Sequence, residues 1–393
     1  MSDWTKTTLG EIANFQNGFA FKPEDWGQEG LPIIRIQNLT GTSEALNKTN
    51  RVVPEQYHVD CGDLLFSWSA SLGVFIWDRG EALLNQHIFK VTPSNRVERD
   101  FLFFLLKSQI VKLLQKTHGS TMRHVTKRDF ERTVISLPPL PEQRRIVDIL
   151  NHADSICRLR RQAEQKASEI IPALFIEMFG DPVENPRGWE LRPLGEVLTR
   201  IDGGWSPKCG NRPAKEEEWG VLKLSAVTYG NYRPSENKIL PDTLSPRAEI
   251  KVHVGDVLFT RKNTRELVGA VAYVEEAPGN LMLADTIFRL VPNETIKMTP
   301  RYLWAVLGSS PMRPTIQALA TGAANSMPNI SKARLKTIPI PLPPVEMQRL
   351  FAERVEAIRA TQAQQTRMAE TAEATLQALM ARYFDAPPEL AAA

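Results

Sequence analysis

The sequence predicts an α+β protein in which two similar domains are joined by two long antiparallel helices that form a coiled coil. Three observations predict this fold. A proline-rich run that leads into a long charged segment occurs twice, short motifs recur in the same order in both halves, and two segments share a heptad-like apolar pattern. Together they indicate an internal repeat with a pseudo-twofold relation between its copies.

The proline runs mark the junctions between domains and helices. The first, Leu-Pro-Pro-Leu-Pro-Glu-Gln, covers residues 137–143, and the second, Leu-Pro-Pro-Val-Glu-Met-Gln, covers residues 342–348, so the glutamines lie 205 residues apart (348 − 143 = 205). Proline fixes φ and disfavours helical backbone in the residue before it, so each run ends a domain in an extended conformation. We therefore expect Gln143 and Gln348 to begin two helices in equivalent positions.

Shorter motifs extend the repeat over the rest of the chain. Trp-x-x-x-x-Leu-Gly-Glu at residues 4–11 recurs at 189–196, and Gly-Asp-x-Leu-Phe at 62–66 recurs at 255–259. The separation between copies grows from 185 residues (189 − 4 = 185) to the 205 of the proline runs. The order of elements is therefore kept, and the second copy has gained loop residues.

Within each copy, short apolar and β-branched runs are separated by Gly, Pro, Asn and Asp, which predicts strands and turns. These runs cover residues 31–37, 63–68, 88–92, 221–224, 268–274 and 287–291. Two short helices are expected near the ends of the domains, at 101–115 and 301–307. The expected organisation is a domain over 1–142, a helix over 143–180, a domain over 181–345, a helix over 346–385 and a tail over 386–393.

The two long helices carry a seam in which apolar residues recur at steps of four and three. The residues expected to pair the helices are Ile146, Leu150, Ala153, Ala167, Ile171 and Leu174 in the first, and Phe351, Val355, Ile358, Ala372, Leu376 and Leu379 in the second. Roughly 36 residues at about 1.5 Å each form a rod of about 54 Å. Pro172 is expected to kink or interrupt the first helix.

Composition excludes several classes of protein. No run of about 18 apolar residues is present, so no membrane span is expected, and the N-terminal sequence does not resemble a signal peptide. The cysteines, Cys61, Cys157 and Cys209, are scattered, which indicates neither a disulfide framework nor a metal site. The phosphate-loop, dinucleotide, zinc-protease and serine-hydrolase motifs are missing. We therefore expect a cytoplasmic, non-catalytic protein without a cofactor or metal of its own.

Local charge indicates nucleic acid better than the net charge of +3 does. Residues 295–345 contain no Asp or Glu but six Lys or Arg, and small polar loops at 117–125 and 320–330 lie within or beside basic runs. Such loops suit DNA phosphates and base edges, although each alone is equally consistent with a solvated hairpin. The candidate DNA-binding residues are Arg35, Gln37, Asn38, Ser67, Ser120, Arg123, Lys127, Lys223, Arg261, Lys262, Asn263, Arg265, Asn325, Asn329 and Lys332.

With these features in place, the chain resembles the specificity subunit of type I DNA restriction-modification systems over essentially its whole length. The resemblance rests on the proline junctions at 137–146 and 342–351 and on the Leu-Gly-Glu and Gly-Asp-x-Leu-Phe motifs, and Met347 departs from the Glu-Gln pairing of the first junction. It implies two target-recognition domains, each reading one half of a bipartite, asymmetric site in double-stranded DNA. It also implies a coiled coil that sets the spacing between them.

The resemblance further implies partner subunits. Two modification subunits would bind S-adenosylmethionine and methylate adenine at N6, and two restriction subunits would use ATP and Mg²⁺ to translocate and cleave DNA. Two other hypotheses remain open at this point. An enzyme, such as a stand-alone methyltransferase or nuclease, predicts that the isolated chain binds S-adenosylmethionine. A coiled-coil adaptor without a nucleic-acid function predicts no binding to any duplex, and a stand-alone DNA-binding protein would lack a methyltransferase partner.

Overall fold

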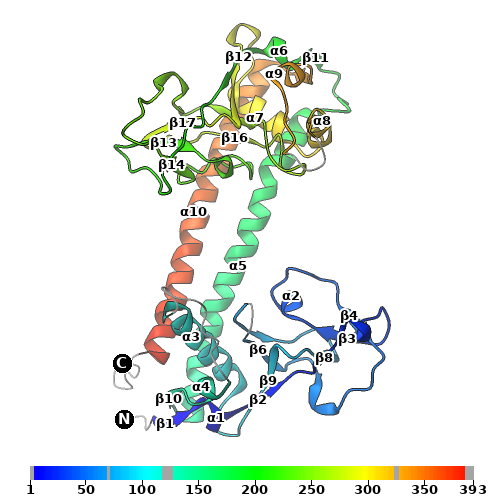
Figure 1. The fold of residues 1–393 in the computed structure, drawn as a ribbon, viewed down its shortest axis with the longest axis vertical. Helices are drawn as coiled ribbons and strands as arrows, with labels where there is room; N and C mark the ends of the chain where they lie inside the picture. Colours follow the sequence, from blue (N-terminus) through cyan, green and yellow to red (C-terminus); the bar gives the residue numbers. More distant parts are fainter. Residues whose placement is uncertain (1–3, 69–70, 117–126, 323–326, 386–393) are drawn as a thin grey trace. The chain divides into compact units, whose positions relative to one another are not determined.

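The computed structural model describes residues 4–68, 71–116, 127–322 and 327–385. It divides into two compact units, one of Met1–Gln162 with Thr366–Ala393 and one of Ala163–Gln365. Each unit contains one mixed α/β domain and part of both long helices (Figure 1). The predicted α+β fold with two similar domains and two long helices is thus confirmed. No helix in the described part of the chain is long and apolar enough to cross a membrane.

The first domain contains three sheets. One pairs β1 (Thr5–Thr8) with β10 (Val134–Leu137). The second has the order β2 (Ala13–Asn17), β9 (Ile88–Pro93), β6 (Leu64–Ser67) and β7 (Gly73–Ile76), and the third has the order β4 (Asn47–Thr49), β3 (Leu31–Ile34), β8 (Ala82–Leu84) and β5 (His58–Val59). Its helices are α1 (Leu9–Ile12), η1 (Pro23–Asp25), α2 (Ile36–Leu39), η2 (Glu55–Tyr57), α3 (Arg99–Lys116) and α4 (Lys127–Glu131).

The second domain repeats this plan. The equivalent sheets are β11 (Glu190–Pro193) with β19 (Pro339–Leu342), then β12 (Leu198–Gly203), β18 (Ile287–Pro292), β15 (Val257–Thr260) and β16 (Val271–Tyr273), and then β14 (Asn237–Ile239), β13 (Trp219–Leu222) and β17 (Asn280–Met282). In both domains the third sheet contains one parallel pair, β3 with β8 and β13 with β17. The helices of the second domain are α6 (Leu194–Val197), η3 (Leu224–Ala226), η4 (Ala248–Ile250), η5 (Glu294–Ile296), α7 (Pro300–Gly308), α8 (Met312–Ala318) and α9 (Lys332–Leu335).

The long helices are α5 (Leu140–Phe179) and α10 (Val345–Phe384). Gln143 and Gln348 are each the fourth residue of a helix, so the expectation that they begin the helices is wrong by one turn, while their equivalence holds. In α5, Pro141 lies in the first turn, where proline is tolerated because the N–H groups have no intrahelical partner. In α10, the helix begins directly after Pro344 with Val345. The interruption expected at Pro172 does not occur, since α5 runs through that residue.

Both helices contribute to the core of both units. In the first unit, Ile146 and Leu150 of α5 share a core with Leu376 and Met380 of α10. In the second unit, the later part of α5 packs in one core with the earlier part of α10, around Phe351. The start of one helix therefore accompanies the end of the other, which is an antiparallel pairing. Every residue of the expected seam is buried or half-buried.

The buried glutamines explain why the junction sequence occurs twice. The Oε1 atom of Gln143 accepts a hydrogen bond from the backbone N–H of Glu98 at 2.8 Å, and that of Gln348 accepts one from Thr299 at 2.9 Å. Each Nε2 group donates to the carbonyl oxygen five residues earlier, at 2.8 and 2.9 Å. Each amide thus joins a long helix to the segment before α3 or α7 and to its own proline run.

The Gly-Asp-x-Leu-Phe motif forms a turn and an ion pair inside each domain. The glycines have φ of +93° and +90°, a left-handed conformation that favours glycine. The following carboxylate, Asp63 or Asp256, lies 2.7 Å from Lys90 Nζ in the first domain and 3.3 Å from Arg289 Nη1 in the second. The basic partners are equivalent residues of β9 and β18, so the motif is structural in both copies.

Candidate nucleic-acid interface

A phenylalanine on the second strand of the central sheet supports a lysine in each domain. Phe89 lies on β9 and Phe288 on β18, at equivalent positions 199 residues apart (288 − 89 = 199). Lys127 Nζ donates to a backbone carbonyl of β2 at 2.5 Å and lies 5.8 Å from the centre of the Phe89 ring. Lys332 Nζ donates to a carbonyl of β12 at 2.6 Å and lies 5.5 Å from the Phe288 ring. This arrangement is common to both domains.

A second side chain packs on each phenylalanine ring, and this side chain differs between the domains. Trp68 follows β6 directly, and its indole stacks on Phe89 with ring centres 5.8 Å apart and an interplanar angle of 27°. Arg261 follows β15 directly, and its guanidinium carbon lies 5.1 Å from the centre of the Phe288 ring. One framework position thus carries an apolar aromatic residue in the first domain and a cation in the second.

A second loop holds the Arg261 side chain. Arg261 Nε donates to Asn329 Oδ1 at 3.0 Å. The backbone of Asn329 is itself fixed, because its N–H donates to Thr321 O at 2.8 Å and its carbonyl accepts from Thr321 N–H at 3.0 Å. Lys262 forms a backbone bridge with the same asparagine. The loop after β15 and the segment that leads into α9 therefore form one surface. Four of the candidate DNA-binding residues lie on it: Arg261, Lys262, Asn329 and Lys332.

The basic side chains Arg261, Lys262 and Lys332 of this surface form no ion pair within the described parts of the chain. Two acidic residues of the neighbouring segments are already engaged: Asp202 pairs with Arg289 at 2.8 Å, and Asp285 accepts a hydrogen bond from a serine hydroxyl at 2.7 Å. A cationic surface of this kind suits the phosphates and base edges of DNA.

Three of the candidate residues support loops instead. Asn38 is 2% exposed, and its amide accepts from the backbone N–H of Arg35 and donates to two carbonyls of the following loop. Ser67 is fully buried, and its hydroxyl donates to the carbonyl four residues later. Asn263 Nδ2 donates to Thr228 Oγ1 at 3.1 Å, and Asn263 is also buried. The expectation that these three side chains face DNA is corrected here, because polarity alone does not distinguish a loop brace from a base contact.

The other candidates are dispersed. Gln37 is half-buried on α2, Lys223 lies 3.5 Å from a Glu236 carboxylate oxygen, and Arg265 is exposed in the loop after β15. Ser120, Arg123 and Asn325 lie outside the described residues. Sequence reasoning assigned no role to Trp68, Phe89 or Phe288. The available signal was the Ile-Phe-Lys/Arg run that recurs at 88–90 and 287–289.

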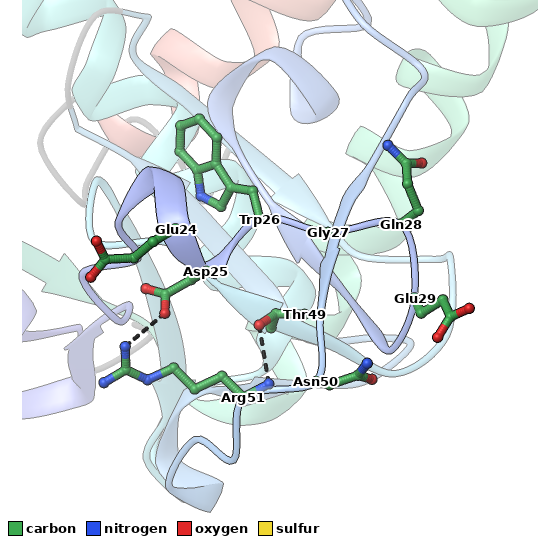
Figure 2. Close-up of a pocket in the computed structure, with 9 residues that line it drawn as sticks. All are labelled: Glu24, Asp25, Trp26, Gly27, Gln28, Glu29, Thr49, Asn50 and Arg51. Carbon is green, nitrogen blue, oxygen red and sulfur yellow. Dashed lines mark hydrogen bonds and ion pairs between the residues drawn. The ribbon is translucent and has the colours of Figure 1, made fainter.

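Arg35 lies beside a pocket of about 540 Å³ that is lined by residues 24–29 and 49–51 (Figure 2). The Arg35 guanidinium carbon is 4.7 Å from the centre of the ring of Trp26, which is 38% exposed. In the pocket, Arg51 Nη1 lies 2.7 Å from Asp25 Oδ1. A hydrogen bond from the backbone N–H of Lys22, together with the Arg51 guanidinium, lowers the pKa of Asp25 below its ordinary value. With three carboxylates and one guanidinium, the lining disfavours phosphate.

Among the described residues, no reactive groups are gathered at the surface built on Phe288 or in the pocket beside Arg35. Burial raises the pKa of the Cys157 and Cys209 thiols, which disfavours the thiolate. Among the described residues, no three His, Cys, Asp or Glu side chains are placed to hold a metal ion. The residues brought together by the fold are suited to binding through positive charge, aromatic surface and amides.

Comparison with known proteins also indicates DNA recognition. The family model described as "Type I restriction modification DNA specificity domain" matches residues 1–168 and 186–373. The EcoEI specificity subunit of Escherichia coli is 38% identical over 170 residues, which cover 42% of this chain but only 28% of that protein. The EcoBI specificity subunit of E. coli is 23% identical over 90% of this chain and 79% of its own length. The MjaVIII specificity subunit of Methanocaldococcus jannaschii is 25% identical over 91% and 86%.

Two solved structures share the fold. The type I restriction-modification S subunit from M. genitalium has a TM-score of 0.55 and 14% identity, covering 96% of this chain and 95% of that chain. The second structure is from work on complex assembly and conformational transition of the type I R-M system. One of its chains has a TM-score of 0.58 and 21% identity to this chain, and 97% of both chains is covered. At these identities the likeness establishes the fold alone.

Proposed function

This chain belongs to the type I restriction-modification DNA specificity family, and from that premise we propose that its two domains read the two halves of a bipartite, asymmetric DNA site. Specificity subunits of these systems are non-catalytic. The proposed target-recognition domains are residues 1–142 and 181–345, and each would present the surface built on Phe89 or Phe288 to the duplex. The proposed place of action is the cytoplasm, where bacterial and archaeal DNA is found.

The observation that carries this proposal is a repeated framework with a different group at one equivalent, half-buried position. The glutamine junction, the Gly-Asp turn and the lysine over phenylalanine occur in both domains. The neighbouring position carries Trp68 in one domain and Arg261 in the other. Equal scaffolds with unequal contact groups are what two readers of different half-sites require, because base contacts specify sequence whereas the scaffold only positions them.

The long helices have a second proposed role. We assign α5 and α10 to setting the number of base pairs between the half-sites and to docking two modification subunits. Those subunits would carry S-adenosylmethionine and methylate adenine N6, and two restriction subunits would add ATP- and Mg²⁺-dependent cleavage. Two readers held at a fixed separation engage one duplex only at half-sites with a fixed gap, because B-DNA repeats about every 34 Å.

Methylation mapping tests the proposal. The chain is expressed with the modification subunit of its own system in cells that lack other adenine methyltransferases, and N6-methyladenine is mapped across the genome. The expected result is one motif with two different half-sites separated by a gap of constant length. A single contiguous motif, or no methylation above that of the modification subunit alone, contradicts the proposal.

A further inference from the structure

The guanidinium of Arg261 is held in a particular orientation by its neighbours. Asn329 Oδ1 accepts from Nε, and the ring of Phe288 lies under the guanidinium carbon at 5.1 Å. Nε is therefore occupied by a protein acceptor and one face of the group is covered. The two terminal nitrogens have no hydrogen bond to the described residues. Arg261 is half-buried, so these nitrogens lie at the surface with little rotational freedom.

A fixed pair of parallel N–H donors matches one base edge better than the others. Guanine presents O6 and N7 as two adjacent acceptors in the major groove, whereas adenine pairs one acceptor with a donor. Cytosine offers a donor there, and thymine offers one acceptor beside a methyl group. A phosphate also accepts two parallel N–H bonds, so geometry alone leaves guanine and phosphate as possible acceptors.

Charge on the surrounding surface favours guanine over phosphate for this arginine. Lys262 and Lys332 lie on the same surface and have no carboxylate partner among the described residues, and Arg265, four residues after Arg261, is exposed. These ammonium groups and the exposed guanidinium are sufficient for phosphates, which need no fixed geometry. The side chain that is braced by an amide and an aromatic ring is the one suited to discrimination, because a rigid fork loses less entropy per hydrogen bond.

We infer that Arg261 is a specificity-determining residue that reads one guanine in the half-site of the second domain, with Asn329 as its positioning residue. This rests on the proposed DNA-reading function and goes beyond it by naming the base and the residue. At the equivalent position of the first domain, Trp68 has a single N–H group, which is buried, so this residue cannot make a bidentate contact to guanine. The two half-sites therefore differ in how this position is read.

The first test is methylation mapping with Arg261→Ala. The substitution removes every donor of the guanidinium, so loss of a guanine contact relaxes one position of the motif, whereas loss of a phosphate contact weakens binding to all sequences. The expected result is that one guanine in one half-site becomes tolerant of other bases, while the second half-site and the gap stay unchanged. Continued methylation of sites that retain the guanine shows that the variant folds. Arg187→Ala, a matched change at an exposed arginine in the segment between α5 and β11, is expected to leave the motif intact.

The second test uses the purified chain with its modification subunit and a synthetic duplex of the mapped motif. Replacing the implicated guanine by 7-deazaguanine removes the N7 acceptor. The unsubstituted protein is expected to lose about tenfold in affinity for this duplex, in the range of one good base contact. Arg261→Ala has no donor for the guanine and is expected to bind both duplexes equally. Asn329→Ala keeps the guanidinium but removes the amide that holds it, so its loss of affinity on the modified duplex should lie between the losses of the unsubstituted protein and of Arg261→Ala.

Two outcomes overturn the inference. If Arg261→Ala leaves every position of the motif as stringent as before, Arg261 reads no base. If Arg261→Ala lowers methylation or affinity equally on all sequences, the contact of Arg261 is to phosphate. Both differ from failure of the proposed function, in which the unsubstituted chain directs no bipartite methylation at all.

Discussion

Gln143 and Gln348 hold the same place in the two halves of the chain, as the fourth residue of a 40-residue helix with a fully buried side chain. Each amide oxygen accepts from the backbone N–H of the residue directly before α3 or α7, and each amide nitrogen donates to the proline run of the same junction. The glutamine therefore determines how a domain is attached to the helix that follows it.

Removing either amide is expected to destabilise the chain. Gln348→Ala or Gln143→Ala leaves buried N–H and carbonyl groups without partners, which costs about 1–3 kcal/mol for each group. We expect about 3 kcal/mol less stability for either variant by urea unfolding followed by circular dichroism. Gln364→Ala, on the exposed side of α10, is the control and should stay within about 0.5 kcal/mol of the unsubstituted chain. Equal stability of the buried-site and control variants contradicts the attachment role.

Packing of α10 in the second unit can be tested at adjacent residues. Phe351 is fully buried, with its ring 5.5 Å from Phe179 and 5.9 Å from Phe175, whereas Leu350 is 42% exposed. Phe351→Ala is expected to cost about 3–5 kcal/mol, because it opens a cavity among aromatic rings. Leu350→Ala should cost less than about 1 kcal/mol. Thermal unfolding of the two variants makes the comparison, and a similar melting temperature for both would show that α10 does not dock by this face.

One glycine is required where β12 ends. A Cβ atom on Gly204 would lie 2.2 Å from the carbonyl oxygen of Ala284, and Gly18 makes the same approach to Asn85 in the first domain. Gly204→Ala is therefore expected to displace the backbone and sharply reduce the yield of folded protein. Gly308→Ala, at the end of α7, meets no atom within 4 Å and should be neutral or stabilising by up to about 1 kcal/mol. Limited proteolysis distinguishes them, and equal resistance would disprove the close approach.

The cationic surface of the second domain predicts a specific salt dependence. Lys262→Ala removes one charge that has no carboxylate partner among the described residues. The slope of log K against log salt concentration should become shallower by about 1, with a similar loss of affinity on any duplex. Lys166→Ala on the exposed side of α5 should leave the slope unchanged. Titration at several salt concentrations measures both, and an unchanged slope for Lys262→Ala would exclude a phosphate contact there.

The proposed spacing role of the helices predicts a change in gap length. Inserting one heptad into the polar middle of both α5 and α10 keeps the seam in register and adds about 10 Å to each helix. Methylation mapping should then find a gap longer by about three base pairs with both half-sites unchanged. Replacing seven exposed helix residues without insertion is the control. New bases in either half-site, at an unchanged gap, would refute the spacing role.

The duplication and the helices could be predicted because their signals are local and occur twice. Proline runs, heptad spacing and the Gly-Asp turn each depend on a few adjacent residues, and a second copy excludes chance. The start of α5 at Leu140 was misplaced by three residues, because proline residues that break a helix interior are accepted in its first turn.

The binding surface was predictable only in part, since it depends on contacts between distant segments. Arg261 and Asn329 are 68 residues apart, and no pattern within either loop reveals their hydrogen bond. Asn38 and Asn263 have the composition of base readers, but their burial shows that they brace loops. Trp68 and Arg261 could be recognised as equivalent only after the sheets placed both residues beside a phenylalanine.

The division of the chain into units has a consequence for its synthesis. The second unit is one continuous stretch, Ala163–Gln365, whereas the first needs residues from both ends of the chain. Its core contains Leu150 and also Leu376, which the ribosome adds 226 residues later (376 − 150 = 226). At about 5–20 residues per second this delay is roughly 10–45 s. The domain that leaves the ribosome first is thus the last to close its core, and its apolar surface needs protection from aggregation until translation ends.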